Sequence, residues 1–580
     1  MISSSCRMVL RHANRLYYYH LQRMNTKPCF ANPAQLVIPV LAGLLLTQIT
    51  VGELCAAPVE ELGWQAKGTH GVVVAGRTGS AEAGLEILKQ GGHAADAAAA
   101  TILALSVTDH NEFCFGSEVP ILIYDAPRGV VEVISGMGTA PQLATREHFN
   151  KAGGIRPNTA AAAAVPAALD AILTLLEQYG TLRFADVAAP ALRLLDKHEK
   201  DWHADLARTW RRLVAAENVS LDRRRGLRLA ADCFYRGPIA REIDAWSRAN
   251  NGLIRFHDLA TYTSRIEEPV RADYRGYTIC KCGPWTQGPY LLQALKLLAG
   301  FDLAHLGFQE PATIHVIIES MKLALADRDV YYGDPLFVEV PLRELLSAGY
   351  TEMRRTLIDR QHASMTQRPG DPRAGKALLG ESETRYGLRG PAKDTTTCVV
   401  ADCWGNLVAA TPSGWSGVQA GHTGVWLGSR LISFNTWPGH PNCIEPGKRP
   451  RITLTPSLVL KNNKPLMAVS VAGGDTQDQA TLQMICNHLD FGRPADVLVT
   501  TPRYTTLHFT GSFNQTPPAL GEMMISPELG TNVITGLKTL GHVIQLQTPP
   551  SWRTVICIDP KTGLMHGAGD STAGRHAGGF

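Results

Sequence analysis

A long tract without regular pattern, residues 359–394, interrupts an otherwise regular sequence and ends abruptly at Thr395. Eight glycines and prolines lie in it among charged residues. A tract of this length inside a compact chain is either a linker or a functional loop. The fold must therefore leave this tract at the surface and begin a buried strand directly after it.

Two β-hairpins and a helix are predicted downstream of this tract. The first hairpin pairs residues 395–401 with 407–411, and the second pairs 457–460 with 466–471. Gly473 and Gly474 follow the second hairpin, and a helix is expected over 476–489 with Asp475 as its N-cap.

Upstream of the tract the chain is mainly helical. Apolar spacing predicts helices over 80–90, 96–107, 290–299 and 312–332, an amphipathic helical region over 160–230, a hairpin over 121–134 and a strand over 277–279. Helices first, strands in the middle and flanking helices predict a layered α+β domain.

Thr395 is a candidate nucleophile because of where it lies. A threonine hydroxyl needs a base, and an N-terminal threonine provides one in its own freed α-amine. That mechanism requires a cleavable segment upstream and a rigid strand downstream, and both are predicted here. A run such as Thr395–Thr397 also opens ordinary strands, so spacing alone leaves both interpretations open.

Two further features are candidates for the same site. A strand that runs into Gly473-Gly474 and a helix directs backbone N–H groups at one point, as in an oxyanion hole, although a tight turn gives the same pattern. Ser413 ends the return strand of the first hairpin, so its hydroxyl is expected beside Thr395, or else it is an ordinary loop serine.

Charge and motif content argue against several other classes. The formal net charge is +4, which is too weak for nucleic-acid binding. No cofactor motif is present, and the 19 histidines show no metal-ligand spacing. Cys280 and Cys282 form a C-x-C pair without a second pair at zinc spacing, and we expect them to be buried or free thiols. The sequence therefore predicts neither a cofactor nor a metal.

The charge excess lies entirely in a leader, residues 1–57, which has five basic side chains and one acidic one. The apolar stretch 36–51 and the small-residue exit at 55–57 are typical of a secretory signal peptide. A membrane anchor through 36–51 and an arginine-rich mitochondrial presequence are the alternatives. We therefore expect the secretory pathway, with an extracellular or membrane-anchored product, and mitochondria as the lesser alternative.

Several long segments in one order resemble the γ-glutamyltranspeptidase family of N-terminal-nucleophile hydrolases. They include AEAGLEILKQGGHAADAAAA (81–100), MKLALADRDVYYGDP (321–335), DTTTCVVADCWGNLVAATPSG (394–414), GKRPRITLTPSLVL (447–460) and AGGDTQDQ (472–479). PWTQGP (284–289) and GGDTQDQ (473–479) are most similar to a divergent branch with oxamate amidohydrolase and glutathione hydrolase-like proteins.

The resemblance implies an autocleaving proenzyme with a four-layer αββα sandwich. Cleavage before Thr395 would leave a large subunit, 58–394, that ends in the flexible linker 359–394, and a small subunit, 395–580. Thr395 would be the nucleophile, Ser413 would replace the family's supporting threonine, and Gly473 and Gly474 would form its oxyanion hole.

Departures from the family pattern fall in the substrate pocket. The arginine that grips the substrate α-carboxylate aligns with Met137. The positions that hold the α-amino and α-carboxyl groups align with Trp415, Arg430 and Ser433, and the paired serines become Ile452 and Thr453. Each lost charged hydrogen bond costs about 1.5–3 kcal/mol. The reaction machinery is therefore expected to persist without the glutamyl pocket.

Three functions follow from these observations. The first is an amidohydrolase that cleaves a small amide or γ-glutamyl-type bond through an acyl-Thr395 intermediate. The second is a γ-glutamyl or acyl transferase acting on glutathione or its conjugates, and the third is an uncleaved pseudoenzyme with a binding or structural role. The expected partners are a small-molecule amide and the chain's own second subunit, without nucleic acid.

Overall fold

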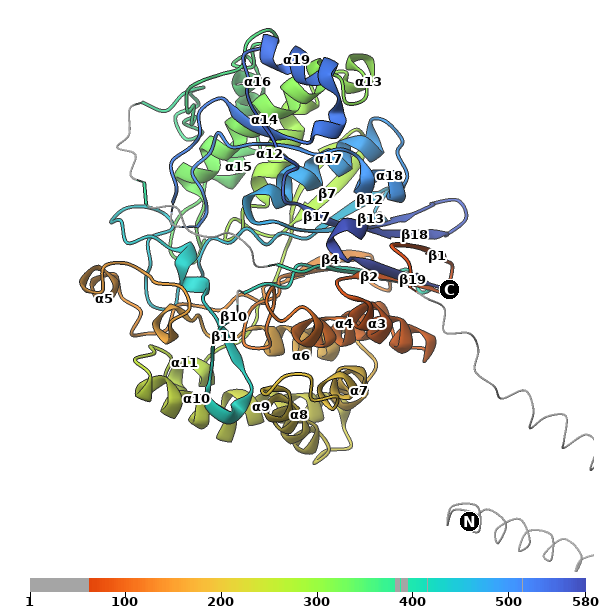
Figure 1. Ribbon diagram of the computed structural model, residues 1–580, viewed down its shortest axis with the longest axis vertical. Coiled ribbons are helices and arrows are strands. Elements are labelled where there is room, and N and C mark those ends of the chain that lie inside the picture. Colours follow the sequence, from red (N-terminus) through yellow and green to blue (C-terminus); the bar gives the residue numbers. More distant parts are fainter. Residues whose placement is uncertain (1–61, 381–385, 388–394, 415, 514) are drawn as a thin grey trace, which may run out of the picture. The chain divides into compact units, whose positions relative to one another are not determined.

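The computed structural model describes residues 62–380, 386–387, 395–414, 416–513 and 515–580. The predicted leader, Asp394 and Trp415 lie outside the described residues. Within the part from Leu62 to Phe580, two stacked β-sheets are covered by helices on both outer faces (Figure 1). This is the layered α+β domain that the sequence pattern predicted, and its four αββα layers are those that the family resemblance implied.

Each central sheet has seven antiparallel strands. The first, sheet A, runs in the order β19 (His576–Gly579), β2 (Gly71–Ala75), β8 (Cys398–Asp402), β9 (Leu407–Ala410), β3 (Ile121–Asp125), β4 (Val130–Ile134) and β5 (Ile266–Glu267). Sheet B runs in the order β1 (Gln65–Gly68), β18 (Met565–Gly569), β17 (Trp552–Ile558), β13 (Lys464–Ala472), β12 (Ser457–Lys461), β7 (Tyr277–Lys281) and β6 (Val270–Tyr274). Strands from both sides of residue 394 therefore share each sheet.

Two smaller sheets lie at the periphery. One pairs β10 (Ser416–Gln419) with β11 (Trp426–Gly428), and the other contains β14 (Tyr504–Thr506), β15 (Glu522–Ile525) and β16 (Val543–Leu546).

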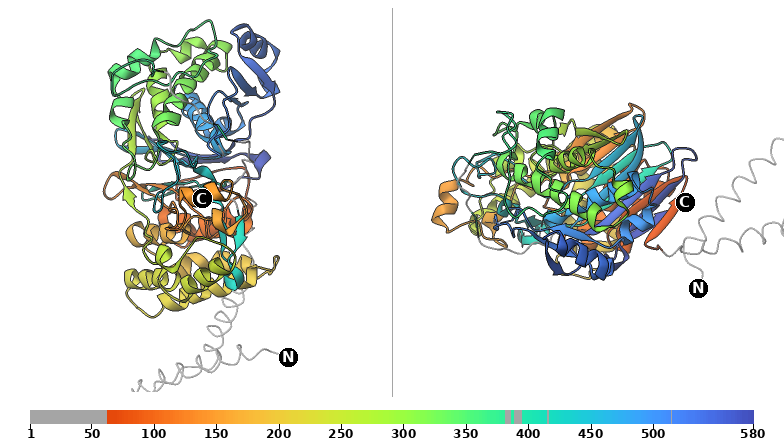
Figure 2. Two further views of the ribbon diagram at one scale, coloured as in Figure 1. Left: turned by 90° about the vertical axis from the view of Figure 1, so that its left-hand side faces the viewer. Right: turned by 90° about the horizontal axis from the view of Figure 1, so that it is seen from above.

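Helices cover the outer face of each sheet (Figure 2). Beneath sheet A lie α3 (Thr78–Lys89), α4 (Ala94–Thr108), α6 (Ala168–Tyr179), α7 (Phe184–Leu195), α8 (His203–Glu217), α9 (Arg223–Tyr235), α10 (Pro238–Ala249) and α11 (Phe256–Ala260). Over sheet B lie α12 (Pro289–Leu298), α13 (Leu303–Leu306), α14 (Pro311–Tyr331), α15 (Leu342–Leu345), α16 (Ala348–Arg355), α17 (Gln477–Leu489), α18 (Ala495–Thr500) and α19 (Thr531–Thr539). The short α5 (Arg146–Lys151) lies to one side.

Alternation along the strands explains why the central strands are apolar throughout. In β2, Val72 and Val74 pack between the sheets, whereas Val73 and Ala75 pack against the helices. Successive side chains point to opposite faces, and both faces of these strands are buried. Helix α4 is rich in alanine because residues 94–106 are all buried. Small side chains allow such a helix to pack closely on every side.

The local predictions were largely confirmed, with two corrections. Strand β8 begins at Cys398, so Thr395–Thr397 precede the strand as an extended segment. Asp475 is not the N-cap of α17; Thr476 occupies that position without a side-chain cap bond. The Asp475 carboxylate instead accepts from Ser512 and forms an ion pair with Arg328.

The first part of the irregular tract packs along α14. Arg368 forms an ion pair with Glu319 at 2.7 Å, and the N–H of Gly370 donates to Asp327 at 2.7 Å. Described residues 359–380 contain no helix or strand, as the sequence indicated. This part of the tract is therefore held by buried polar groups of α14.

A cluster of His315, Glu319 and His542 beside this tract has the composition of a metal site. The two imidazoles are hydrogen-bonded to each other at 2.8 Å, and the Glu319 carboxylate is neutralised by Lys322 and Arg368. Burial lowers the pKa of His542 to about 3, which keeps its ring neutral. A hydrogen-bonded network that holds the tract in place therefore explains how these three side chains are arranged.

Cys280 lies on β7 and Cys282 directly follows it, and both side chains pack in the core between the sheets. Both are free and buried, as predicted. Burial raises the pKa of Cys280 to about 11 and that of Cys282 to about 12.

None of the described helices is long and apolar enough to cross a membrane.

Candidate active site

Thr395 begins the short segment Thr395–Thr397 that leads into β8, and it is fully buried. Its hydroxyl oxygen is 3.2 Å from the hydroxyl oxygen of Ser413. The next residue fixes the register, because the N–H of Thr396 donates to the carbonyl of Pro412 at 2.9 Å. The hairpin therefore places Ser413 beside Thr395, as the sequence predicted.

Ser413 connects Thr395 to a buried ion pair. Arg430 donates through Nη2 to the Ser413 hydroxyl oxygen at 2.8 Å and through Nε to Glu118. Backbone hydrogen bonds in both directions join Glu118 to Ser413. Both charged side chains are almost completely buried, at 1% and 2% exposure. The pair holds the arginine against the serine.

This chain of groups has a clear electrostatic consequence. A hydrogen bond from a cationic donor is stronger than a neutral one, and it polarises the group that accepts it. Ser413, while accepting from Arg430, keeps its own proton for the Thr395 oxygen. Negative charge that develops on the Thr395 oxygen is thereby stabilised.

The Gly473-Gly474 turn lies at the end of β13, next to Thr395. Gly473 has φ +138° and Gly474 has φ +63°, and a Cβ at Gly473 would lie 2.2 Å from the carbonyl oxygen of Pro550. Only glycine adopts this turn without strain. A short 3₁₀ turn, Gly474–Thr476, then leads into α17. The predicted strand–turn–helix geometry is present.

Gln477, the first residue of α17, connects this turn to Thr395. Its terminal amide lies 3.3 Å from the Thr395 hydroxyl. The hydrogen-bond network favours the amide orientation in which the oxygen accepts from the N–H of Gly474 at 3.2 Å and the nitrogen donates to the carbonyls of Val471 and Thr453. The amide oxygen then lies beside both the Thr395 hydroxyl and the Gly474 N–H.

An ion pair fixes the start of α17. Asp478 accepts from Lys281 of β7 at 2.7 Å, and both side chains are fully buried. Lys281 also donates to Ser457 and to the carbonyl of Thr455. Burial raises the pKa of Asp478 and lowers that of Lys281. The pair links the helix to sheet B directly behind Gln477.

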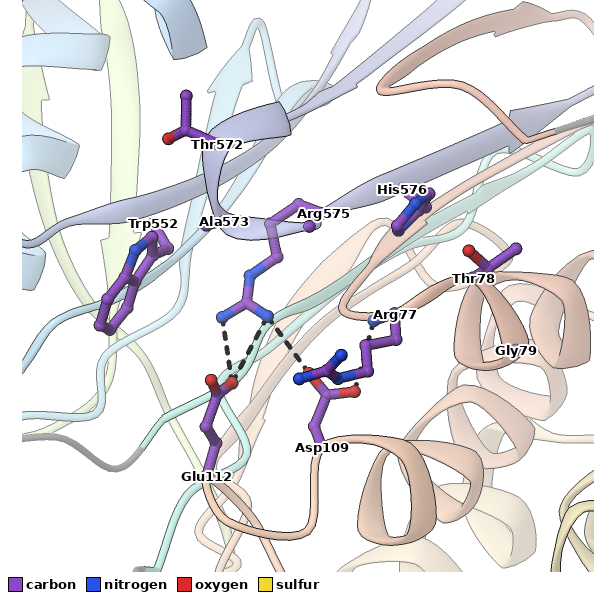
Figure 3. A pocket seen from close by; sticks show the side chains of 11 residues that line it. Arg77, Thr78, Gly79, Asp109, Glu112, Trp552, Thr572, Ala573, Arg575 and His576 are labelled. Atoms are coloured by element: carbon purple, nitrogen blue, oxygen red, sulfur yellow. Dashed lines mark hydrogen bonds and ion pairs between the residues drawn. The ribbon is translucent and has the colours of Figure 1, made fainter.

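A second charged cluster, formed by Arg575, Asp109 and Glu112 (Figure 3), contacts Thr395 through Arg575. Arg575 donates to the Thr395 carbonyl at 3.4 Å and to Asp109 at 3.2 Å, and it forms an ion pair with Glu112. Asp109 also accepts from the hydroxyl of Thr396 at 3.1 Å. Burial raises the pKa of Glu112, against the opposing effect of Arg575. These contacts hold the Thr395 carbonyl and the Thr396 side chain.

The remaining predicted pocket residues are placed less directly. Thr453 lies beside the turn, since its carbonyl is within reach of Gln477. Met137 is buried in the core between the sheets, in the same cluster as Leu431 and Ile452. Ser433 ends the 3₁₀ turn that begins at Arg430, and its carbonyl accepts from Asn442. Trp415 lies outside the described residues.

Four residues of the site were not identified from the sequence: Glu118, Gln477, Asp109 and Arg575. Their partners lie far away along the chain, 312 residues for Glu118 and Arg430 and 180 for Arg575 and Thr395. The sequence signal nearest to any of them is the Gly473-Gly474 pair, which lies three residues before Gln477.

A family comparison gives a match over most of the chain. The family model described as gamma-glutamyltranspeptidase matches residues 80–220 and 195–580. The chain is 32% identical over 489 residues to the acylase ACY 1 proenzyme of Pseudomonas sp. (strain SE83), covering 76% of this chain and 83% of that protein. It is 29% identical over 547 residues to a glutathione hydrolase proenzyme of Bacillus subtilis (strain 168), covering 87% and 90%.

Solved structures show the same relationship. The fold superposes on the cephalosporin acylase from Bacillus halodurans with a TM-score of 0.74 at 27% sequence identity, covering 91% of this chain and 98% of that one. The likeness thus extends across both sheets and both helical layers.

Proposed function

The chain belongs to the γ-glutamyltranspeptidase family of N-terminal-nucleophile hydrolases, and we propose that Thr395 is its nucleophile. Cleavage before Thr395 would give a large subunit that ends at Asp394 and a small subunit, 395–580. The leader, 1–57, would be removed in the secretory pathway or retained as an anchor. The observation that carries the proposal is the chain of contacts from Arg430 through Ser413 to Thr395, beside the Gly473-Gly474 turn.

The reaction follows from these positions. The freed α-amine of Thr395 takes the hydroxyl proton as the oxygen attacks the substrate carbonyl carbon. The carbonyl oxygen of the substrate displaces the Gln477 amide oxygen. The N–H groups of Gly473 and Gly474 then bind the oxyanion that forms on this carbonyl oxygen. The C–N bond breaks, the leaving amine takes the proton, and an acyl ester remains on Thr395. Water then releases the acid.

The acyl side of the site differs from a glutamyl pocket. Met137 offers no charge, and the charge of Arg430 is balanced by Glu118. Arg430 thus acts on Ser413 rather than presenting an uncompensated cation to a carboxylate. We infer a small acyl group, bound beside Met137, Ser433 and Thr453, and hydrolysis as the main outcome. Transfer to an amine, including with glutathione conjugates as donors, uses the same acyl-enzyme.

Removing the Ser413 hydroxyl tests the supporting role. Ser413→Ala removes one hydrogen bond to the nucleophile, whose charge-assisted form is worth about 1.5–3 kcal/mol, so we expect acylation to slow by about 10- to 150-fold. Ser413→Thr keeps the hydroxyl and is the matched control. Burst kinetics with an acyl p-nitroanilide measure the step. Equal rates for Ser413→Ala and wild type would contradict the assignment.

Trapping the intermediate tests the reaction class. The mature protein is incubated with a panel of acyl p-nitroanilides, including acetyl, glutaryl and γ-glutamyl, in the presence and in the absence of glycylglycine, and is quenched in acid for product analysis and peptide mass mapping. We expect the acyl mass on the peptide that begins with Thr395 and free acid as the main product. An adduct on another residue would refute Thr395, and a glycylglycine conjugate as the main product would establish the transferase.

A further inference from the structure

Residues 359–370 of the irregular tract are attached to the fold at two buried histidines on different elements. His315 of α14 donates through Nε2 to the carbonyl of Asp359 at 2.7 Å. The carbonyl of His508, in the loop between β14 and β15, accepts from the Gln367 side chain at 3.1 Å. Both histidines are at most 1% exposed. The attachment of the tract therefore involves titratable rings that are closed off from water.

A third histidine, His542 between α19 and β16, is hydrogen-bonded to His315, and this bond fixes where both protons lie. A carbonyl oxygen only accepts, so Nε2 of His315 carries the proton and its Nδ1 is bare. Nε2 of His542 lies 2.8 Å from that Nδ1 and must donate to it. Nδ1 of His542 is then bare as well, buried and without a hydrogen-bond partner among the described residues. A proton added there would be a buried charge without an acceptor.

His508 is kept neutral by a different contact. The backbone N–H of Gly521 donates to its Nδ1 at 2.9 Å, so the proton of this ring lies on Nε2. A second proton, on Nδ1, would face that N–H and break the hydrogen bond. The side chain of Met365 in the tract packs on Gly521, where a Cβ would lie 2.2 Å from its sulfur. The bond that protonation breaks therefore lies next to the tract.

Charged groups around the three rings oppose a further positive charge. Lys322 of α14 and Arg368 of the tract both form ion pairs with Glu319, at 2.7 Å each. Two cations thus share one carboxylate, and each ring that takes up a proton adds to the excess. Asp359 and His362, at the start of the tract, pair with each other in an exposed position. The Glu319 carboxylate is already neutralised and does not compensate a protonated ring.

The attached state of the tract therefore binds fewer protons than a detached state. Burial, and after it the charge of Lys322, lowers the pKa of His508 to about 4 and that of His542 to about 3, from the ordinary value of 6.5. In a detached state the rings are hydrated and regain the ordinary pKa. The stability of the attached state is thus complete above pH 6.5 and falls as the pH drops toward 4. Each of these two histidines contributes up to about tenfold per pH unit to the equilibrium.

We propose that these three buried histidines form an acid-sensitive switch, which holds residues 359–370 against α14 while the rings are neutral and releases them as the pH falls. This switch is independent of the Thr395 reaction. The loop that carries His508 also reaches the candidate active site, because Ser512 donates to Asp475 directly after the glycine turn. Release of the tract thus removes one contact of the loop that supports this turn.

Hydrogen–deuterium exchange of the purified protein at about pH 7.5 to pH 4.5, corrected for intrinsic exchange rates, tests the switch. We expect the protection of the amides in 359–370 to fall by about tenfold or more per pH unit below about pH 6.5. The amides of α4, in the core, should keep their protection. Exchange of the imidazole C2 hydrogens in the same samples should show His508 and His542 gaining protons over the interval in which the tract is released.

Two substitutions keep the hydrogen bonds and remove the titration. In His542→Gln the amide N–H replaces Nε2 as donor to His315, and in His508→Asn the amide oxygen replaces Nδ1 as acceptor from Gly521. At about pH 4.5 the double variant should protect the tract about tenfold or more above wild type. His440→Asn is the matched control. Burial lowers the pKa of His440 to about 3 as well, but this ring forms no hydrogen bond with the tract among the described residues.

Wild-type protection that stays constant down to about pH 4.5 would overturn this proposal. Equal release by wild type and the double variant would assign the pH dependence to Glu319 and Asp327, whose carboxylates also accept from the tract, and would overturn it too. Loss of acid sensitivity in His440→Asn would indicate general acid unfolding instead. If the double variant does not hold the tract at about pH 7.5, the wild-type C2 exchange decides, because rings that stay neutral while the tract is released exclude the switch.

Discussion

Thr395→Ala is expected to leave the protein as one uncut chain with no measurable amidase activity. The wild-type chain should separate into two fragments, the smaller spanning 395–580, because the Thr395 hydroxyl attacks the preceding peptide carbonyl and later serves as the nucleophile. Thr395→Ser should still cleave, since serine keeps a hydroxyl at the same position. Intact-mass spectrometry of the purified protein measures the cleavage point directly and also reports whether the leader is removed.

Thr397→Val is the matched control for this experiment. Thr397 is as completely buried as Thr395, and its hydroxyl contacts no polar group among the described residues. Valine keeps its shape, so the variant should fold and cleave at the wild-type rate. Cleavage of Thr395→Ala at the same bond, or a wild-type chain that stays whole, would refute the nucleophile and favour the pseudoenzyme.

Whether a feature could be predicted from the sequence depended on how far apart its interacting residues lie along the chain. The hairpin of β8 and β9 and the helices α3, α4 and α17 follow from local periodicity, and the hairpin alone places Ser413 beside Thr395. The Gly-Gly turn was predicted because glycine itself favours the backbone conformation that this turn requires. Predictions that rested on contiguous residues were therefore the ones that the structure reproduced.

Features set by tertiary contacts could not be predicted in this way. Asp475 has the position and chemistry of an N-cap, yet Arg328 and Ser512, distant in sequence, take its carboxylate. Arg430 aligned with a substrate-binding position of the family, and only the fold shows that Glu118 lies against it. No pattern near Asp109 or Arg575 indicates that Asp109 contacts Thr396 or that Arg575 contacts the Thr395 carbonyl. A single sequence shows which residues are present, but it does not show which of them pair in the fold.

Breaking the buried Glu118–Arg430 pair is expected to destabilise the protein and impair the site together. Glu118→Leu leaves a buried arginine without its counter-charge, which typically costs about 3–5 kcal/mol. Urea unfolding, measured in the Thr395→Ala background so that one chain is followed, reports the loss. Glu86→Gln, which breaks the exposed pair with Arg193, is the control and should cost less than about 1 kcal/mol.

The double variant Glu118→Leu with Arg430→Met separates stability from chemistry. Replacing both members of a buried pair by apolar side chains often restores stability. Ser413 then lacks its cationic donor, so we expect cleavage and acylation to remain slow, by about tenfold or more, in a protein that is stably folded. Recovery of the wild-type cleavage rate in the double variant would show that Arg430 only fills space. Slow cleavage in a stable protein would assign the arginine to the polarisation of Ser413, and thus to the positioning of the nucleophile.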